Sequence, residues 1–205
     1  RGMSGATLEQ FAKPELINHS RNARTEDLPL AVAAELPDWV IEKLQQTMGD
    51  TDILALGRAL QQPAPMDVRV NAIKGNRETV LAQLQAEGLA VEATRYSPWG
   101  IRFKAHPAIN RHPLFLDGSL EVQDEGSQLL ALLLGARRGE MVCDFCAGAG
   151  GKTLAIGAMM ASTGRLYAFD VAEKRLANLK PRLARSGLSN VMPQLIASET
   201  DTRVK

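Results

Sequence analysis

The 205-residue sequence is 45% hydrophobic and 23% charged, with a formal net charge of +1, which is typical of a globular protein of one or two domains. It holds no apolar run long enough to cross a membrane and no signal peptide, so we expect a cytoplasmic protein. Two cysteines, Cys143 and Cys146, are too few for a disulfide framework.

Positive charge gathers in the middle of the chain. Residues 66–115 hold seven Lys and Arg against four Asp and Glu, whereas residues 1–65 hold six against nine. The middle segment is therefore the part in which we expect contacts with an anionic partner.

Residues 1–65 are predicted to form an N-terminal arm and a helical pair. The first thirty residues are polar and irregular, as in a loosely packed arm. Helical spacing of apolar residues begins near Leu36, and Gly49 is expected to end this first helix. Thr51 or Asp52 is expected to cap the second helix.

Residues 66–115 are predicted to form a small α+β unit. A strand over 67–71 is expected to precede a helix over 77–87. Strands over 89–96 and 101–104, joined by a turn that contains proline and glycine, complete the unit. A unit of this size buries little apolar surface by itself, so we expect it to pack against a neighbour.

Residues 116–205 alternate between predicted helices and predicted strands. The expected helices are 121–134, 152–162 and 172–186, and the expected strands are 141–146, 165–170 and 192–197. Strands that alternate with helices pair in parallel. The predicted fold class is therefore α/β, with a Rossmann-like layer that follows the small α+β unit and the N-terminal helices.

A glycine-rich loop, DFCAGAGGKT over 144–153, carries the strongest functional signal. It follows an apolar strand and opens a helix, and Gly148, Gly150 and Gly151 allow a tight turn with close approach of a ligand. Asp170 ends the next predicted strand, which is where a nucleotide-binding layer places an acid on ribose hydroxyls.

Several interpretations of this loop compete. A P-loop needs glycine where this sequence has Cys146, and a dinucleotide fingerprint needs a small residue where it has Thr153. A structural turn without a ligand is a third interpretation, but it does not explain the acid on the next strand.

The loop resembles motif I, D-x-C-A-x-x-G-G-K-T, of the RNA cytosine-5 methyltransferases of the Sun or Fmu family. The resemblance continues collinearly from about residue 35 to 197. Leu36-Pro37-Asp38-Trp39 resembles that family's helical entry, and 68–71 resembles the L-R-V-N strand of its RNA-binding domain. Gln123-Asp124-Glu125-Gly126-Ser127 resembles its Q-D-x-x-S helix, and Asp170 with Arg175 its D-x-x-x-x-R.

The resemblance implies S-adenosylmethionine as the cofactor. The backbone of Cys146, Ala147, Gly148, Ala149, Gly150, Gly151 and Lys152 would then hold the methionine part. Asp170 would bind the ribose hydroxyls, and Arg175 would support the site. The family's acid after the third strand is replaced by Ile196-Ala197-Ser198, which leaves Ser198 or Glu199 as substitutes.

The family's catalytic cysteines lie in D-A-P-C and T-C-S motifs, and neither motif occurs in this sequence. We expect Cys143 to be buried and inert in its strand, and Cys146 to lie under the cofactor loop. No residue is therefore assigned to catalysis, and none to a metal. We expect this chain to be the front portion of the enzyme, inactive alone, with the missing C-terminal half as its partner.

The resemblance also implies an RNA substrate, with ribosomal RNA as the expected class. The residues expected to contact RNA are Arg69, Lys74, Arg102 and Lys104. Tyr96 is a candidate for base stacking, whereas Trp99 by itself is interpreted as a core aromatic residue.

Two other functions remain open at this point. The chain could be a non-catalytic module of the same lineage that binds RNA or cofactor, or a nicotinamide-dependent oxidoreductase. The identity of the bound nucleotide separates the oxidoreductase from the other two.

Overall fold

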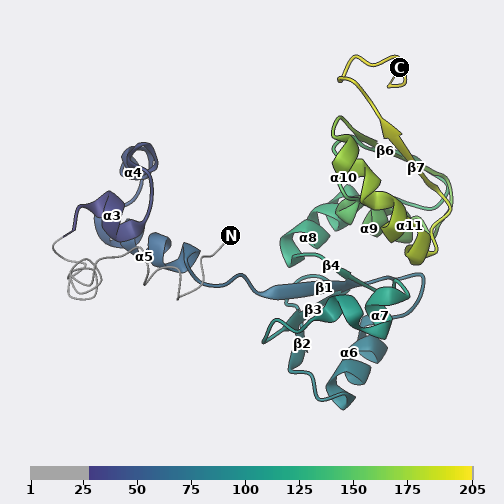
Figure 1. Cartoon of the computed structure of the whole chain (residues 1–205), viewed down its shortest axis with the longest axis horizontal. Helices are drawn as coiled ribbons and strands as arrows, with labels where there is room; N and C mark the ends of the chain where they lie inside the picture. The colour runs from purple at the N-terminus through teal and green to yellow at the C-terminus, as the bar shows by residue number, and fades with distance from the viewer. Residues whose placement is uncertain (1–27, 205) are drawn as a thin grey trace, which may run out of the picture. The chain divides into compact units, whose positions relative to one another are not determined.

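The computed structural model describes residues 28–204, which form two compact units, and the chain passes from the first to the second between Ala64 and Pro65 (Figure 1). Within this range the first unit has one hydrophobic core, and the second has two. No helix within 28–204 is both long and apolar enough to cross a membrane.

The first unit consists of three helices, α3 (Leu30–Ala34), α4 (Asp38–Leu44) and α5 (Asp50–Leu60). They pack around the buried side chains of Ala34, Ile41 and Ile53. The predicted cap of the second helix is wrong, because Gly49 occupies the N-cap position of α5. Asp50 and Asp52 lie instead in its first turn, where a carboxylate complements the positive end of the helix dipole.

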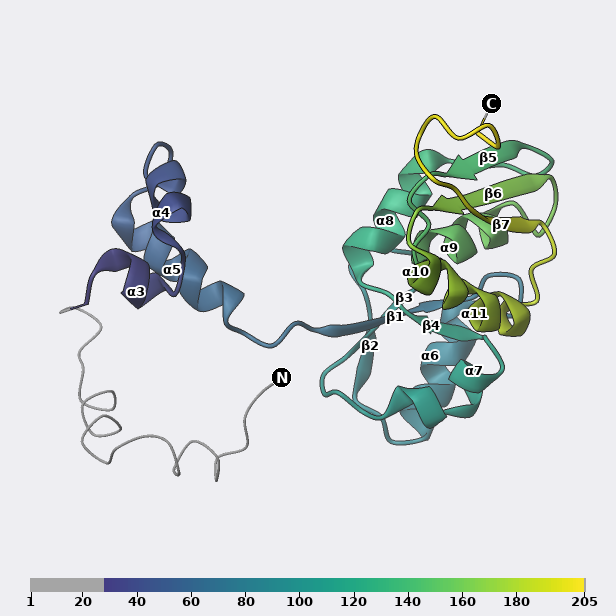
Figure 2. The ribbon, with the colours of Figure 1, turned by 45° about the horizontal axis from the view of Figure 1, so that its top comes forward.

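The second unit begins with a four-stranded antiparallel sheet, which we call the small sheet. Its strands are β1 (Met66–Val70), β2 (Val91–Ala93), β3 (Gly100–Phe103) and β4 (Leu120–Val122), in the order β2-β3-β1-β4. The helix α6 (Arg77–Ala86) covers one face, and η2 (Ile109–Arg111) and α7 (Pro113–Leu116) follow β3 (Figure 2). Asn76 caps α6, accepting a hydrogen bond from Thr79 N at 2.9 Å.

The strand β4 was not expected from the sequence. The predicted helix over 121–134 is wrong at its start, because residues 120–122 pair with β1 and α8 begins only at Glu125 (Glu125–Leu134). The small sheet therefore extends beyond the segment 66–115. The physical reason is that Leu120, Glu121 and Val122 alternate between the two faces of the sheet, so they pair with β1 as an edge strand. Asp124 then caps α8.

Both faces of β1 are buried, and they differ in chemistry. Val68 and Val70 pack with Leu84, Ile101 and other apolar residues in the core beneath α6. The alternating residues Asp67, Arg69 and Asn71 lie on the opposite face and are no more than 3% exposed. Glu121 and Gln123 are buried as well, so the face of the small sheet opposite α6 is polar and covered.

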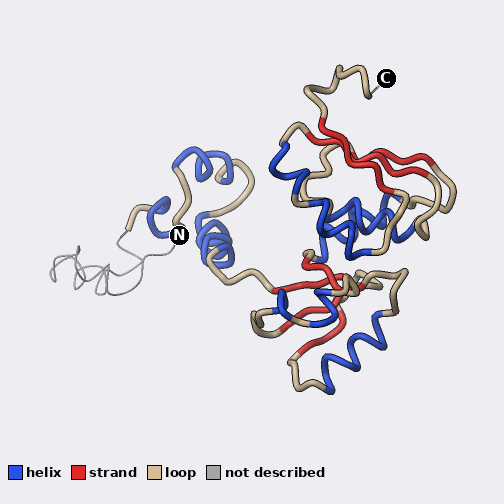
Figure 3. Tube along the Cα trace, turned by 45° about the vertical axis from the view of Figure 1, so that its right-hand side comes forward, coloured by secondary structure: helices blue, strands red, loops and turns tan. Residues whose placement is uncertain are grey.

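The remainder of the second unit confirms the predicted parallel layer. The strands β5 (Met141–Asp144), β6 (Arg165–Asp170) and β7 (Val191–Leu195) pair in parallel in the order β5-β6-β7. The helices α8, α9 (Gly151–Met159), α10 (Glu173–Ala177) and α11 (Leu179–Ser186) lie together on one side of this sheet (Figure 3).

The helix predicted over 172–186 is interrupted. Its two parts, α10 and α11, meet at Asn178, which ends one and begins the other. Pro181 explains the break, because its ring clashes with the carbonyl four residues earlier, at Ala177.

Replacing Leu84 with alanine is expected to lower the free energy of unfolding by about 2–5 kcal/mol, because this side chain of α6 is fully buried against the small sheet. The matched substitution Leu133→Ala, at a side chain that is 81% exposed on α8, should change it by less than about 0.5 kcal/mol. Urea unfolding followed by circular dichroism measures both. Equal losses would contradict the assignment of this core.

Candidate cofactor-binding site

The predicted glycine loop joins β5 to α9 and is held at both ends. Asp144, the last residue of β5, accepts a hydrogen bond from the hydroxyl of Thr153 in the first turn of α9, at 2.6 Å. Because α9 begins at Gly151, the N–H groups of its first turn have no acceptor within the helix. The loop therefore presents free backbone donors at the positive end of a helix.

Two glycines of the loop adopt backbone angles that favour glycine. Gly148 has φ +54° and Gly150 has φ +82°. A Cβ atom on Gly150 would overlap Cδ1 of Leu179, which is fully buried in the core. At Gly148 the nearest heavy atom to such a Cβ is Oδ2 of Asp170, 3.9 Å away, so the backbone there faces open space.

Asp170 ends β6 beside this loop, as the sequence predicts. Its carboxylate is 7% exposed and accepts hydrogen bonds from Gly148 N and Ala172 N, both at 2.7 Å. Each oxygen keeps a second lone pair for another donor. The acid thus fixes the loop and still offers acceptors to a ligand.

A cavity of about 250 Å³ opens at the carboxyl ends of β5 and β6. It is lined by Phe145, Cys146, Gly148, Asp170, Val171, Arg175, Ile196 and Glu199. It brings together four of the residues that the sequence singles out, Cys146, Gly148, Asp170 and Arg175. Glu199, one of the two substitutes that the sequence offers for the acid after the third strand, lines the same cavity.

The other predicted loop residues lie behind or beside the cavity. Ala147 is 7% exposed and packs in the core, while Gly151 and Lys152 begin α9. The carbonyl of Ala149 accepts a hydrogen bond from Arg182 of α11 at 2.7 Å. Sequence reasoning missed Arg182, because one arginine on an amphipathic helix carries no signal of what it will contact.

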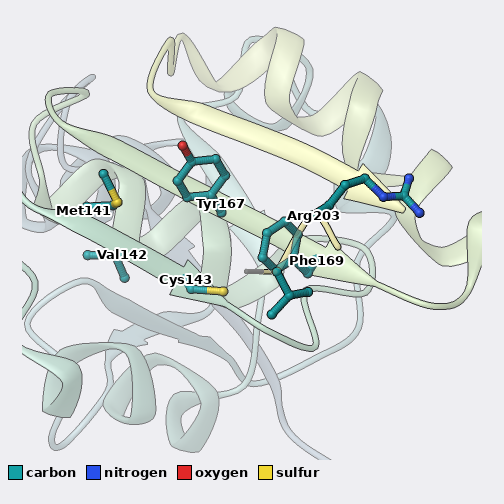
Figure 4. A pocket seen from close by; sticks show the side chains of 7 residues that line it. Met141, Val142, Cys143, Tyr167, Phe169 and Arg203 are labelled. Carbon is teal, nitrogen blue, oxygen red and sulfur yellow. The ribbon is translucent and has the colours of Figure 1, made fainter. Parts of the chain in front are cut away.

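The expectation that Cys143 is buried is wrong. The residue is exposed, because all helices of this layer cover the opposite face of the sheet. A second, larger cavity of about 540 Å³ lies on this uncovered face, with Met141, Cys143, Tyr167 and Phe169 along it (Figure 4). Partial burial raises the pKa of the Cys143 thiol, and the neighbouring Asp144 raises it further, so the thiolate that a nucleophile needs is disfavoured.

The structure contradicts one predicted RNA contact. Arg69 is 2% exposed, donates to Oε1 of Gln123 at 2.7 Å, and points into the polar face of the small sheet. Burial, partly offset by Glu121, lowers the pKa of Arg69 to about 10. A buried guanidinium cannot reach a phosphate, so Arg69 is removed from the candidate contacts.

The other three cations of that prediction differ in what they already contact. Lys74 donates to the backbone carbonyls of Asp117 and Arg185. Arg102 makes a bidentate ion pair with the buried Asp67, at 2.7 and 2.8 Å. Lys104 pairs with the exposed Glu92 at 3.4 Å, a contact that competes weakly with a phosphate, so it is the best placed of the three.

The turn between β2 and β3 presents an aromatic ring to solvent. Tyr96 is 62% exposed, and the guanidinium of Arg95 lies 5.0 Å from its ring centroid. The backbone of the turn is fixed, because the carboxylate of Glu125 accepts hydrogen bonds from Tyr96 N and Ser97 N. Burial opposes ionisation of Glu125, but these N–H groups hold its pKa below the ordinary value. Trp99, by contrast, is half-buried.

Two family models match this chain. A ferredoxin-like domain of RsmF/B-like methyltransferases matches residues 36–110, and 16S rRNA methyltransferase RsmB/F matches residues 131–204. The first match includes most of the small sheet, and the second includes β5, β6, β7 and the cavity between the loop and Asp170.

Individual relatives agree with these matches. The chain is 32% identical over 167 residues to a probable ribosomal RNA small subunit methyltransferase B of Synechocystis, covering 81% of this chain and 37% of the relative. It is 32% identical to a 28S rRNA (cytosine-C(5))-methyltransferase of Mus musculus, covering 65% of this chain and 32% of the relative. A crystal structure of a methyltransferase homolog protein from Pyrococcus horikoshii superimposes with a TM-score of 0.65 at 27% identity, covering 80% of this chain and 57% of the other. The chain thus spans less than half the length of these two sequence relatives.

Replacing Gly150 with alanine is expected to destabilise the protein more than replacing Gly139, although both glycines have nearly the same φ, +82° and +81°. The left-handed backbone costs about 1–2 kcal/mol at either position. At Gly150 the clash with Leu179 adds about 1–3 kcal/mol, whereas nothing lies within 4 Å at Gly139. Thermal unfolding of the two variants measures the difference, and equal melting temperatures would refute the close packing of the loop on α11.

Proposed function

The chain belongs to the family of RsmB/F-like methyltransferases, and from this premise we propose that it is the cofactor- and RNA-binding front portion of an RNA cytosine-5 methyltransferase that uses S-adenosylmethionine. Ribosomal RNA is the proposed substrate class. The observation that carries the proposal is the cavity formed by the glycine loop and Asp170 at the carboxyl ends of β5 and β6.

The residues around this cavity fit S-adenosylmethionine. The free N–H groups at the start of α9 suit a carboxylate, and the open space in front of Gly148 admits a ligand close to the backbone. Asp170 has lone pairs left for ribose hydroxyls, and Arg175 and Glu199 lie along the same cavity. When bound, the cofactor supplies a methyl group on a positively charged sulfur.

RNA contact is proposed for the exposed surface of the small sheet. Lys104 and the Arg95–Tyr96 pair offer a cation for phosphates and a ring for base stacking. Arg102 contributes positive charge while it compensates the buried Asp67. The proposed protein acts in the cytoplasm.

We propose that a further protein segment completes the parallel sheet and brings the catalytic cysteine. Support comes from apolar surface that the described residues 28–204 leave uncovered, which includes Met141 at 72%, Leu133 at 81% and Leu130 at 57% exposure. An uncovered apolar face beside an unpaired strand edge favours pairing with another strand. Cys143 and Cys146 receive no catalytic role, and methyl transfer by this chain alone is expected to be undetectable.

Calorimetric titration of the chain is expected to show binding of S-adenosylmethionine and none of NAD or ATP. Asp170→Ala removes the proposed ribose acceptor, and a hydrogen bond to a charged group is worth about 1.5–3 kcal/mol, so the affinity should fall at least about tenfold. Gly150→Val should abolish binding because it displaces the loop.

The matched control is Glu173→Gln, an exposed acid at the start of α10 that does not line the cavity. Its affinity should equal that of the unmodified chain. A folded chain that does not bind S-adenosylmethionine would refute the proposal, and selective binding of NAD would point to an oxidoreductase.

The double variant Tyr96→Ala/Lys104→Ala is expected to weaken binding of a short fluorescein-labelled single-stranded RNA. Loss of one stacking partner costs about 1–3 kcal/mol, and loss of one phosphate contact reduces the salt slope by about one. Fluorescence anisotropy at several salt concentrations measures both. Arg138→Ala serves as control, because Arg138 lies in the turn between α8 and β5 and belongs to no strand of the small sheet. If both proteins bind RNA like the unmodified chain, the small-sheet surface is not the RNA site.

A further inference from the structure

Glu121 connects the small sheet to the helix α11. This residue of β4 is 3% exposed, and each of its carboxylate oxygens accepts two hydrogen bonds from one arginine. Oε2 accepts from Nε and Nη2 of Arg182, at 3.0 and 2.8 Å. Oε1 accepts from Nε and Nη2 of Arg185, at 3.0 and 2.7 Å. The two arginines therefore compensate the buried charge almost symmetrically.

The two arginines differ in what their remaining atoms contact. Nη1 of Arg182 donates to the carbonyl of Ala149 in the glycine loop, at 2.7 Å. The guanidinium of Arg185 instead lies over the ring of Phe115, 4.2 Å from its centroid. Only Arg182 therefore joins the carboxylate of the small sheet to the backbone of the proposed cofactor loop.

The bond from Arg182 holds the carbonyl end of the peptide group between Ala149 and Gly150. The peptide plane between Ala149 and Gly150 is rigid, so holding its carbonyl also sets the direction of Gly150 N, which donates to Ala147 O at 2.8 Å. Gly150 has φ +82°, a backbone state in which glycine is conformationally free unless contacts hold it. Arg182 supplies such a contact.

The small sheet supports the loop at a second point. Gln123, which follows β4, has its Nε2 atom 3.6 Å from the position of a Cβ on Gly151, and Arg69 holds its Oε1 atom. Two residues in or next to β4 thus support the loop. Glu121 acts through Arg182, and Gln123 lies directly beside Gly151.

We propose that Arg182 is a positioning residue that holds the Ala149–Gly150 peptide of the cofactor loop on a support provided by Glu121 of the small sheet. An arginine suits this role because its planar fork donates to the carboxylate and to a carbonyl at the same time. The identity of the cofactor rests on the function proposed above, whereas the loop support rests on the contacts alone. Through this link, binding at the small sheet and binding at the loop would affect each other reciprocally.

The variants Arg182→Met and Arg185→Met test this role as a matched pair. The two side chains are 19% and 22% exposed, and each loses two hydrogen bonds to Glu121. Both variants should therefore lose similar thermal stability. The dissociation constant for S-adenosylmethionine should rise about tenfold in Arg182→Met and less than about twofold in Arg185→Met. Equal changes in affinity would overturn the proposal.

A second measurement needs no ligand. Amide hydrogen exchange at Gly150 should be faster in Arg182→Met than in Arg185→Met, because only the former frees the Ala149–Gly150 peptide. Arg182→Lys keeps the charge but lacks the planar fork that reaches Glu121 and Ala149 together, so exchange at Gly150 should still be faster than in Arg185→Lys, and this pair serves if Arg182→Met does not fold. Equal exchange in the two methionine variants would refute the role of Arg182. Faster exchange at Gly150 in Arg182→Met than in Arg185→Met, without any binding of S-adenosylmethionine, would support the role of Arg182 and refute the proposed cofactor.

Discussion

The buried carboxylate of Glu121 is the interaction on which the arrangement of the second unit depends. A carboxylate that is 3% exposed destabilises a fold unless nearby charges and hydrogen bonds compensate it. Arg182 and Arg185 provide that compensation from α11, so β4 and α11 must lie side by side. The same polar face carries Asp67, which is paired with Arg102. The small sheet and the parallel layer are therefore joined through charged groups whose geometry is specific, rather than through apolar surface that tolerates sliding.

That junction has consequences for the proposed cofactor site. Residues from three parts of the fold contact the glycine loop. They are Asp170 from β6, Leu179 and Arg182 from α11, and Gln123, which follows β4. Only the first belongs to the two strands that form the cavity. A loop with two left-handed glycines is held in one conformation because neighbours from both layers contact it. The small sheet thus contacts the loop through Gln123 and Arg182, in addition to carrying the surface proposed for RNA.

The face of the parallel sheet opposite its helices explains the position of Cys143 and of the aromatic residues beside it. The helices α8, α9, α10 and α11 cover one face, which buries Leu166 and Ala168 fully and leaves Cys143, Tyr167 and Phe169 along an open cavity. Cys143 lies on the open face because strand residues alternate between faces. Partial burial raises the pKa of its thiol, and the neighbouring Asp144 raises it further.

The sequence by itself determined the features that depend on local order along the chain. The strand-loop-helix around Gly148, Gly150 and Gly151, the acid Asp170 at the end of the next strand, and the parallel pairing all follow from spacing, glycine chemistry and alternation. Only the tertiary structure decided which face each strand buries and against what. Arg69 was assigned to RNA because it is one of the cations of the basic middle segment, yet the face of β1 that carries it is buried. Glu121 looked helical, and Arg182 had no signal, because their roles arise from contacts between residues about sixty positions apart, which local pattern cannot encode.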